Sequence, residues 1–485
     1  METANRAVAE KQMEVKTTEM EAALAEADAG LRHGLESPVT VVARAGDGRL
    51  EAVPYPEAAL EEVEALALAV KAAAHELALG GGSLAGEYLK ARADALLSNH
   101  YRVSEEMWME WMASGVTAGA PLVVALGPYV TRAEMGGGVC KTAWLCATGV
   151  YDAAATRIVV GALDGWSALN AELPGVEAGA ALLRLPQVCI RVVNVVMLAG
   201  LDPRAPPPLA LNLPCEAVVR STRGAVALVL GNVAAAVHAR VAAPLAALIA
   251  EPGLPQPKLD DLVYLVAARQ VAYALGPAVL VVDEHSLESV EGALGESALV
   301  LEELKGLLLG LYVARQHAPR TRWASLVATF VINTLRSLRL LLADGDAGAS
   351  AAAHTAVLGW LFRVQALSVV SGLAPDSKKA SSGEETSEVV VVAHAQILRA
   401  PASRKWISWD AAVFGERLAG GVGLVLGLIS AGDAAAASEW ISLLSGEYES
   451  QAAKVEAVLS QNAVARSVPV SITLAGYEAG AAADV

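Results

Sequence analysis

Two segments in the second half of the chain, VAYALGP at residues 271–277 and LEELKGLLLGLY at residues 301–312, decide how the whole sequence is interpreted. Both lie within residues 258–342, where the pattern is almost wholly that of α-helices. Nearer the N-terminus, β-branched and apolar runs at residues 121–130 and 188–199 predict strands. The sequence therefore predicts an α+β fold in which helices predominate.

The rest of the chain divides between further strands and helices. Residues 39–53, VTVVARAGDGRLEAV, predict a strand, a turn and a second strand. Residues 56–99 predict helices that are broken at a run of three glycines. Residues 209–233 are expected to form strands and residues 234–250 a helix, and the sequence between the strands predicted at 121–130 and 188–199 is expected to be helical.

Composition and charge exclude several classes of partner. Hydrophobic residues make up 54% of the chain and aromatic residues only 5%, so the core is expected to consist mainly of Leu, Val and Ala. The net charge is −16, from 36 basic and 52 acidic residues, without a cluster of Lys and Arg, which argues against nucleic acid and against an anionic membrane surface. The four cysteines lack metal-binding spacing and indicate buried thiols in a reducing compartment.

No membrane-spanning or targeting segment is expected. Leu418–Ala431 is shorter than the roughly 20 apolar residues that a spanning helix needs. Leu299–Tyr312 carries three charged residues. The first 32 residues resemble a polar, Glu-rich helix that extends from the body or docks on a partner, and they lack the apolar region of a signal peptide. A location in the cytoplasm or inside an organelle is expected.

One local signal suggests a metal site but is incomplete. His75 and Glu76 begin HELALG, which resembles the HExxH helix motif of zinc peptidases. Leu79 stands where the second histidine belongs, so these residues are interpreted as a helix-surface pair.

A more informative signal is a series of short segments in a fixed order. They are EAVPYPEA (51–58), ARADALLSN (91–99), VVALGPYVT (123–131), LALNLPCEAV (209–218), LGNVAAAVHARVAAPLAALI (230–249), VAYALGP (271–277), LEELKGLLLGLY (301–312), TLRSLRLLLADG (334–345) and AGDAAAA (431–437). This order resembles the dipeptidyl peptidase III family of zinc metallopeptidases, particularly the variant that is fused to a Nudix domain in plants. The resemblance spans about residues 50–475 and includes no Nudix domain.

The resemblance implies a zinc site between two helices, the first carrying HELxH and the second a glutamate in EEAKAD. The shared LGP segment places Arg269 at the first histidine, Gln270 at the general-base glutamate and Tyr273 at the second histidine. HELxH is thus replaced by Arg269-Gln270-Val271-Ala272-Tyr273. The second helix retains Glu302 and Glu303, of which Glu303 matches the third zinc ligand.

These replacements remove what zinc hydrolysis needs. A catalytic zinc takes about three protein ligands and an activated water, which Glu303 alone does not provide. Arg269 adds a permanent positive charge at a ligand position, and Gln270 cannot accept a proton from water. Zinc is therefore expected to be absent, and we expect Arg269 to pair with Glu303 or Glu302 in its place.

Two other interpretations remain open at this point. One is an active zinc dipeptidyl peptidase in which His285, His238 or His354 converges on Glu303. The other is a different enzyme that uses Arg269, Tyr273 and Glu303 in the same cleft, although no pair of nucleophile and base is visible.

Three residues are candidates for a binding groove. Asn212 lies in ALNLPCE, which resembles the family's groove-lining FNLPNDE, although the end of a strand explains it equally well. Arg336 and Arg339 match the arginines of the family's FRSIRFG and are able to hold a substrate carboxylate. At i,i+3 spacing they are equally able to form an ion-pair face on a helix surface.

The resemblance implies a two-lobed fold with a helical lobe and a smaller strand-containing lobe. The expected regions are an N-terminal polar helix or extension (1–35), a mixed α/β lobe (36–255), a helical lobe with the altered zinc-site helices (256–372), a flexible loop (373–389) and a C-terminal strand with helices (390–485). The implied function is that of a catalytically degenerate member acting as a binding or structural subunit, with a protein partner or larger complex expected and a peptide as a possible ligand.

Overall fold

The computed structural model covers the chain, and a subset of its residues is described here. The described residues are 1–12, 15, 17–117, 121–135, 139–176, 181–182, 187–201, 207–283, 286–343, 348–372 and 404–461. The predicted loop at 373–389 and the strand expected after it lie outside these residues.

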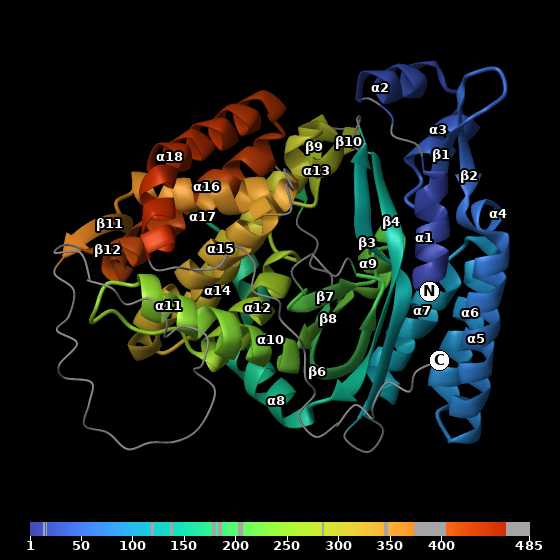
Figure 1. Cartoon of the computed structure of the whole chain (residues 1–485), viewed down its shortest axis with the longest axis horizontal. Coiled ribbons are helices and arrows are strands. Elements are labelled where there is room, and N and C mark those ends of the chain that lie inside the picture. The colour runs from blue at the N-terminus through green and yellow to red at the C-terminus, as the bar shows by residue number, and fades with distance from the viewer. Residues whose placement is uncertain are drawn as a thin grey trace.

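A five-stranded sheet stands at the centre of the molecule (Figure 1). In spatial order its strands are β3 (Leu122–Met135), β4 (Val139–Tyr151), β6 (Val188–Ala199), β8 (Ala225–Leu230) and β7 (Ala210–Leu213). Strands β6 and β8 are parallel, and the other neighbours are antiparallel. Strand β6 has the predicted bounds. The expectation of helix between β3 and β6 was wrong for β4, because its hydrogen bonds to both neighbours hold this Ala- and Thr-containing segment extended.

The sheet separates two hydrophobic cores, and β8 shows how. All six residues of this strand, AVALVL, are buried, as expected for a strand that is covered on both faces. Ala227 and Val229 belong to one core, whereas Val226 and Leu228 belong to the other, because successive side chains of a strand point to opposite faces.

The N-terminal lobe packs on one face of the sheet. It contains α1 (Glu2–Lys11), α2 (Thr17–Glu26), α3 (Ala29–Glu36), β1 (Thr40–Arg44), β2 (Leu50–Pro54), α4 (Tyr55–Ala58), α5 (Leu60–Leu79), α6 (Ser83–Ser98), α7 (Arg102–Glu110) and the short π-helix η1 (Trp111–Gly115). The hairpin predicted at 39–53 is present as the antiparallel pair β1–β2, and the helix break at the three glycines separates α5 from α6.

The first 36 residues form three helices rather than the one that was expected. Helix α1 docks on the body of this chain, because the Asn5 amide donates to the Trp144 carbonyl at 2.8 Å and accepts from the Trp144 N–H at 2.9 Å. Ala4 and Val8 on the same face are buried in the N-terminal core. This contact explains why a segment with a polar composition is held against the fold.

The helical lobe covers the other face of the sheet (Figure 1). Its helices are α8 (Ala153–Ala162), η2 (Trp166–Glu172), α10 (Gly231–Val237), η3 (His238–Ala242), α11 (Ala243–Ile249), α12 (Leu259–Ala272), α13 (Val290–Leu294), α14 (Ser297–His317), η4 (Arg320–Arg322), α15 (Trp323–Ala343), α16 (Ala349–Arg363), α17 (Ala411–Ala431) and α18 (Ala434–Gln461). Short strands accompany them: β5 (Ala181–Leu182), β9 (Val279–Asp283), β10 (Ser286–Ser289), β11 (Leu367–Gly372) and β12 (Arg404–Trp409). The molecule therefore has the two-lobed α+β fold that was expected, with helices dominant.

Three helical segments are long and apolar enough to cross a membrane by length and composition: Gly231–Ile249, Arg320–Leu341 and Ala411–Ala431. The expectation of no such segment was wrong on these criteria, since Ala and Gly extend the apolar run of α17 back to Ala411. In the fold, 39%, 67% and 44% of the 18-residue apolar windows in these segments is buried, and Phe414, Leu418 and Val422 of α17 pack into the core of the helical lobe.

Candidate functional site

A cavity of about 560 Å³ opens where strand β7 faces the helical lobe. Helices α12, α14, α15 and α16 supply most of its wall, and α9 (Ala217–Arg223) adds one arginine. Seven residues singled out from the sequence line it: Arg269, Gln270, Tyr273, Glu302, Glu303, Asn212 and Arg336. Arg339 is not among the described residues of the wall, although it shares α15 with Arg336.

Two glycines let α12 and α14 approach closely below the cavity. A Cβ on Gly306 would lie 2.8 Å from the Tyr273 ring, and one on Gly310 would lie 2.8 Å from the Cα of Arg269. These glycines are four residues apart and so lie on one face of α14. The KGLLLG sequence thereby brings the side chains of α12 against those of α14.

The contact between these helices carries a cluster of three polar side chains. The Arg269 guanidinium forms an ion pair with Glu303, as the sequence predicted. Arg269 Nε also donates to the Tyr273 hydroxyl at 2.9 Å, and that hydroxyl donates to Glu303 Oε1 at 3.1 Å. The Arg269 and Glu303 side chains are 25% and 28% exposed, so the cluster forms part of the cavity wall and is partly open to solvent.

The electrostatics of the cluster stabilise its charged arginine. Burial alone would lower the pKa of Arg269, but Tyr273 and Glu303 raise it above its ordinary value. Burial raises the pKa of Tyr273 well above that of a free phenol, although Arg269 opposes the change. The tyrosine therefore remains a neutral hydroxyl, able to donate to the carboxylate.

Glu302 and Asn212, which the sequence also predicted as site residues, make polar contacts beside this cluster. Glu302 forms an ion pair at 2.7 Å with the ammonium group of the buried Lys305, which lies one turn along α14. The Asn212 amide of β7 lies 3.5 Å from the Gln270 carbonyl, which joins the sheet edge to α12. The sequence placed these residues near one another only through the family resemblance.

Two further residues of the wall are Arg220, which sequence reasoning missed, and His354, which it named only as a possible relocated zinc ligand. Arg220 comes from α9, and His354 comes from α16, where it is 2% exposed. The His354 Nδ1 atom lies 2.7 Å from the Ser350 carbonyl and therefore carries the proton. Burial, with a smaller contribution from Arg269, lowers the pKa of His354 to about 4, so that the ring is neutral near pH 7. No local motif marks either residue.

The donor set around Glu303 does not fit zinc. Both of its oxygens already accept hydrogen bonds, one from the Arg269 guanidinium and the other from the Tyr273 hydroxyl. Within the part of the chain that the structure describes, no three His, Cys, Asp or Glu side chains are grouped to hold a metal ion. Of the alternative histidines, His238 contacts the Pro257 carbonyl, and His285 lies outside the described residues.

A central sheet facing a helical lobe across a cavity, with α12 and α14 packed side by side below it, defines the two-lobed fold class of dipeptidyl-peptidase III. Two solved structures establish this. The dipeptidyl-peptidase III from Corallococcus sp. strain EGB matches with a TM-score of 0.68 and 22% identity, covering 91% of this chain and 75% of that chain. The protein from Caldithrix abyssi matches with a TM-score of 0.65 and 22% identity, covering 95% of this chain and 78% of its own.

Among curated proteins, Nudix hydrolase 3 of Arabidopsis thaliana is 24% identical over 262 residues, which are 53% of this chain and 33% of the relative. The match thus spans about a third of that relative's length. No protein-family model matches the chain.

Proposed function

We propose that this chain is a dipeptidyl-peptidase III-like protein that does not hydrolyse peptides with zinc and instead acts as a binding subunit. The observation that carries the proposal is the cluster at Glu303, whose carboxylate is held by Arg269 and Tyr273. A carboxylate neutralised in this way has little capacity left for a metal cation, and a guanidinium cannot lose its charge to become a ligand. Gln270, on the same helix, cannot act as a general base.

The cavity is the part of the peptidase fold that this role would use. Its volume of about 560 Å³ falls within the range of ligand pockets, roughly 300–1,000 Å³. We infer that the protein works with a protein partner or inside a larger complex, because the scaffold segments are retained while the catalytic side chains are replaced. A reducing compartment such as the cytoplasm fits the free thiols of Cys146, Cys189 and Cys215.

A second candidate function is an active zinc dipeptidyl peptidase with a relocated ligand. It is favoured by one observation, that His354 lines the same cavity as Glu303 and Glu302 with its Nε2 atom unprotonated. This candidate requires the Arg269–Glu303 ion pair to open so that the carboxylate can bind metal.

The zinc content of the purified protein separates the two functions. We expect no stoichiometric zinc in protein prepared without chelators, and no release of arylamine from a dipeptidyl arylamide. The combined variant Arg269→His, Gln270→Glu and Tyr273→His should gain zinc, because it restores two imidazoles and a base beside Glu303. Stoichiometric zinc in the unaltered protein that is lost in Glu303→Ala would reject the proposal in favour of the peptidase.

A further inference from the structure

The cavity wall contains a buried arginine that forms no ion pair with another residue described by the structure. Arg336 of α15 is 5% exposed. Its Nε donates to Asn333 Oδ1 at 3.1 Å and its Nη2 donates to Ser337 Oγ at 3.3 Å, both within its own helix. Its Nη1 atom is buried and has no hydrogen-bond partner among the described residues. Burial lowers its pKa to about 10, and no nearby carboxylate raises it.

A buried guanidinium without an ion-pair partner lowers the stability of the fold. An isolated buried charge loses its hydration, and an ion pair or hydrogen bonds must replace that loss. The two neutral contacts within α15 fix the orientation of the planar guanidinium, and Arg336 is one of the residues that line the cavity. A preoriented guanidinium with a free edge is suited to bind a carboxylate.

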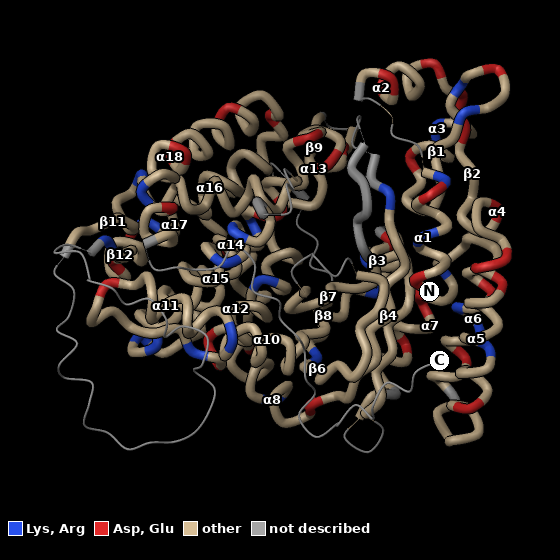
Figure 2. The backbone as a smooth tube through the Cα atoms, viewed as in Figure 1, with Lys and Arg blue, Asp and Glu red and all other residues tan. Residues whose placement is uncertain are grey.

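The charge balance of the whole cavity wall also favours an anionic ligand. Three arginines and two glutamates of the described residues line the cavity: Arg220, Arg269, Arg336, Glu302 and Glu303. The glutamates are already paired, with Lys305 and with Arg269. Arg220 and Arg336 are left unpaired among the described residues, in a protein whose overall charge is −16. Figure 2 shows basic positions on α12, α14 and α15 in the middle of the molecule, with acidic positions frequent along α4–α7 at its edge.

The same wall also presents two unused acceptors. The His354 Nε2 atom carries a lone pair, because Nδ1 holds the proton, and it has no partner among the described residues. The Asn212 Oδ1 atom is likewise buried without a partner in the described part of the chain. Acceptors left in this state are satisfied by N–H or O–H groups of a ligand.

We propose that this cavity binds a small carboxylate that also carries an N–H donor, with Arg336 holding the carboxylate and His354 or Asn212 accepting from the donor. Free amino acids and the C-terminal end of a short peptide share this chemistry. The inference rests on the proposed function of the cavity as a binding site and names the class of ligand.

Binding to three probes tests the proposal: alanine, trialanine, and trialanine with a C-terminal amide, each measured by calorimetry with the full-length protein. We expect the amide to bind at least ten-fold more weakly than trialanine, since a hydrogen bond to a charged group contributes about 1.5–3 kcal/mol. Arg336→Met should reduce binding of the carboxylate probes by a similar factor. Arg320→Met, at an exposed arginine outside the described wall, is the matched control and should bind as the unaltered protein does.

Each outcome decides the matter. Arg336-dependent binding of trialanine but not of alanine supports the proposal with a peptide end as the source of the carboxylate, and equal binding of both supports it with a free amino acid. No binding of either carboxylate, or binding that Arg336→Met leaves unchanged, overturns it. Circular dichroism shows that each variant is folded. Zinc content and peptidase activity of the same preparations report separately on the proposed function.

Discussion

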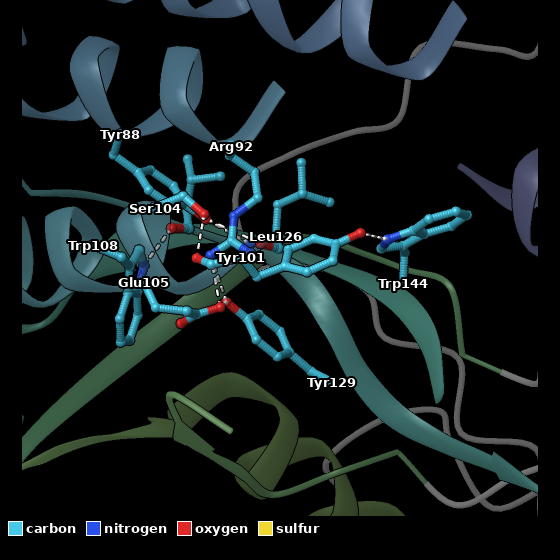
Figure 3. Close-up of polar contacts among 10 residues, drawn as sticks. Tyr88, Arg92, Tyr101, Ser104, Glu105, Trp108, Leu126, Tyr129 and Trp144 are labelled. Carbon is cyan, nitrogen blue, oxygen red and sulfur yellow. Dashed lines mark hydrogen bonds and ion pairs between the residues drawn. The ribbon is translucent and has the colours of Figure 1, made fainter. Parts of the chain in front are cut away.

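Among the residues that the structure describes, arginine, glutamate and tyrosine side chains meet inside the N-terminal lobe and again in the wall of the cavity. In the N-terminal lobe, Arg92 Nη2 donates to Glu105 Oε1 at 2.7 Å and lies 3.2 Å from the Tyr129 hydroxyl, which itself donates to Glu105 at 2.8 Å (Figure 3). The Arg92 guanidinium also lies 5.5 Å and 5.3 Å from the ring centres of Tyr88 and Tyr101. This is an arginine in an aromatic cage.

The cavity cluster repeats the triangle of Arg269, Tyr273 and Glu303, with one cation–π contact at 5.9 Å. The difference lies in burial. The Arg92 and Glu105 side chains are 0% and 3% exposed, whereas those of Arg269 and Glu303 are 25% and 28% exposed.

Burial assigns different roles to the same three residue types. In the N-terminal lobe the pair is sealed between α6, α7 and β3, so it contributes to the packing of that lobe and is closed to ligands. In the cavity the pair borders open volume, so it sets the charge that a ligand meets. The chemistry of a site therefore depends on its surroundings as much as on its residues.

The largest effect expected from this comparison is on the sealed cluster. Glu105→Gln keeps the shape of the side chain but leaves the Arg92 charge buried without its counter-charge. Breaking a buried pair in this way costs about 3–5 kcal/mol, which urea unfolding would measure. Glu106→Gln is the control, because Glu106 pairs with Arg102 on the surface at 3.2 Å and should change stability by about 0.5 kcal/mol or less. Equal losses in the two variants would contradict the role given to burial.

A pH titration gives the next largest effect and concerns the neighbour of the cavity cluster. His354 has its pKa lowered from the ordinary 6.5 to about 4 in the folded protein, by burial first and by Arg269 second. Above pH 6.5 the ring is neutral in both the folded and unfolded states and contributes nothing to the pH dependence. Between 6.5 and 4 the unfolded chain binds a proton that the folded protein excludes, so stability falls as the pH falls, by about 3 kcal/mol in total.

The variant His354→Gln isolates this contribution. Its free energy of unfolding should fall less steeply than that of the unaltered protein between pH 6.5 and 4, and the two curves should run parallel above that window. His75 is exposed, and His75→Gln serves as the matched control substitution. Identical slopes for His354→Gln and the unaltered protein would show that the histidine is not held neutral by burial.

Part of the fold follows from local sequence. The run VCIRVVNVVMLA gave strand β6 its bounds, and the glycine break gave the ends of α5 and α6. Strand β4 was not predictable in the same way. Its small residues have weak strand preference alone, and it is held extended between β3, which directly precedes it in the chain, and β6, which is distant in sequence.

The candidate site likewise contains contacts that the sequence could predict and others that it could not. The Arg269–Glu303 contact could be predicted because the LGP segment set the register of one helix and EEL that of the other. Arg220 could not, since it stands alone in sequence on α9, and His354 of α16 was named only as one of three histidines that a relocated zinc site would use. The burial of His354 and the place of both residues in the cavity wall are determined by tertiary packing.

The smallest effect should come from the cavity cluster itself. Glu303→Gln removes the carboxylate from Arg269 but leaves the guanidinium with the Tyr273 hydroxyl and with access to solvent in the cavity. Because about a quarter of each side chain is exposed, the pair is partly screened, and its loss should cost about 1 kcal/mol. Urea unfolding of this variant beside Glu105→Gln measures the difference directly.

Raising the salt concentration should reduce the stability cost of Glu303→Gln more than that of Glu105→Gln, because solvent ions reach the exposed pair and not the sealed one. A loss for Glu303→Gln that equals the loss for Glu105→Gln and does not respond to salt would mean that the cavity is closed in solution, and would remove the basis for a ligand at Arg336.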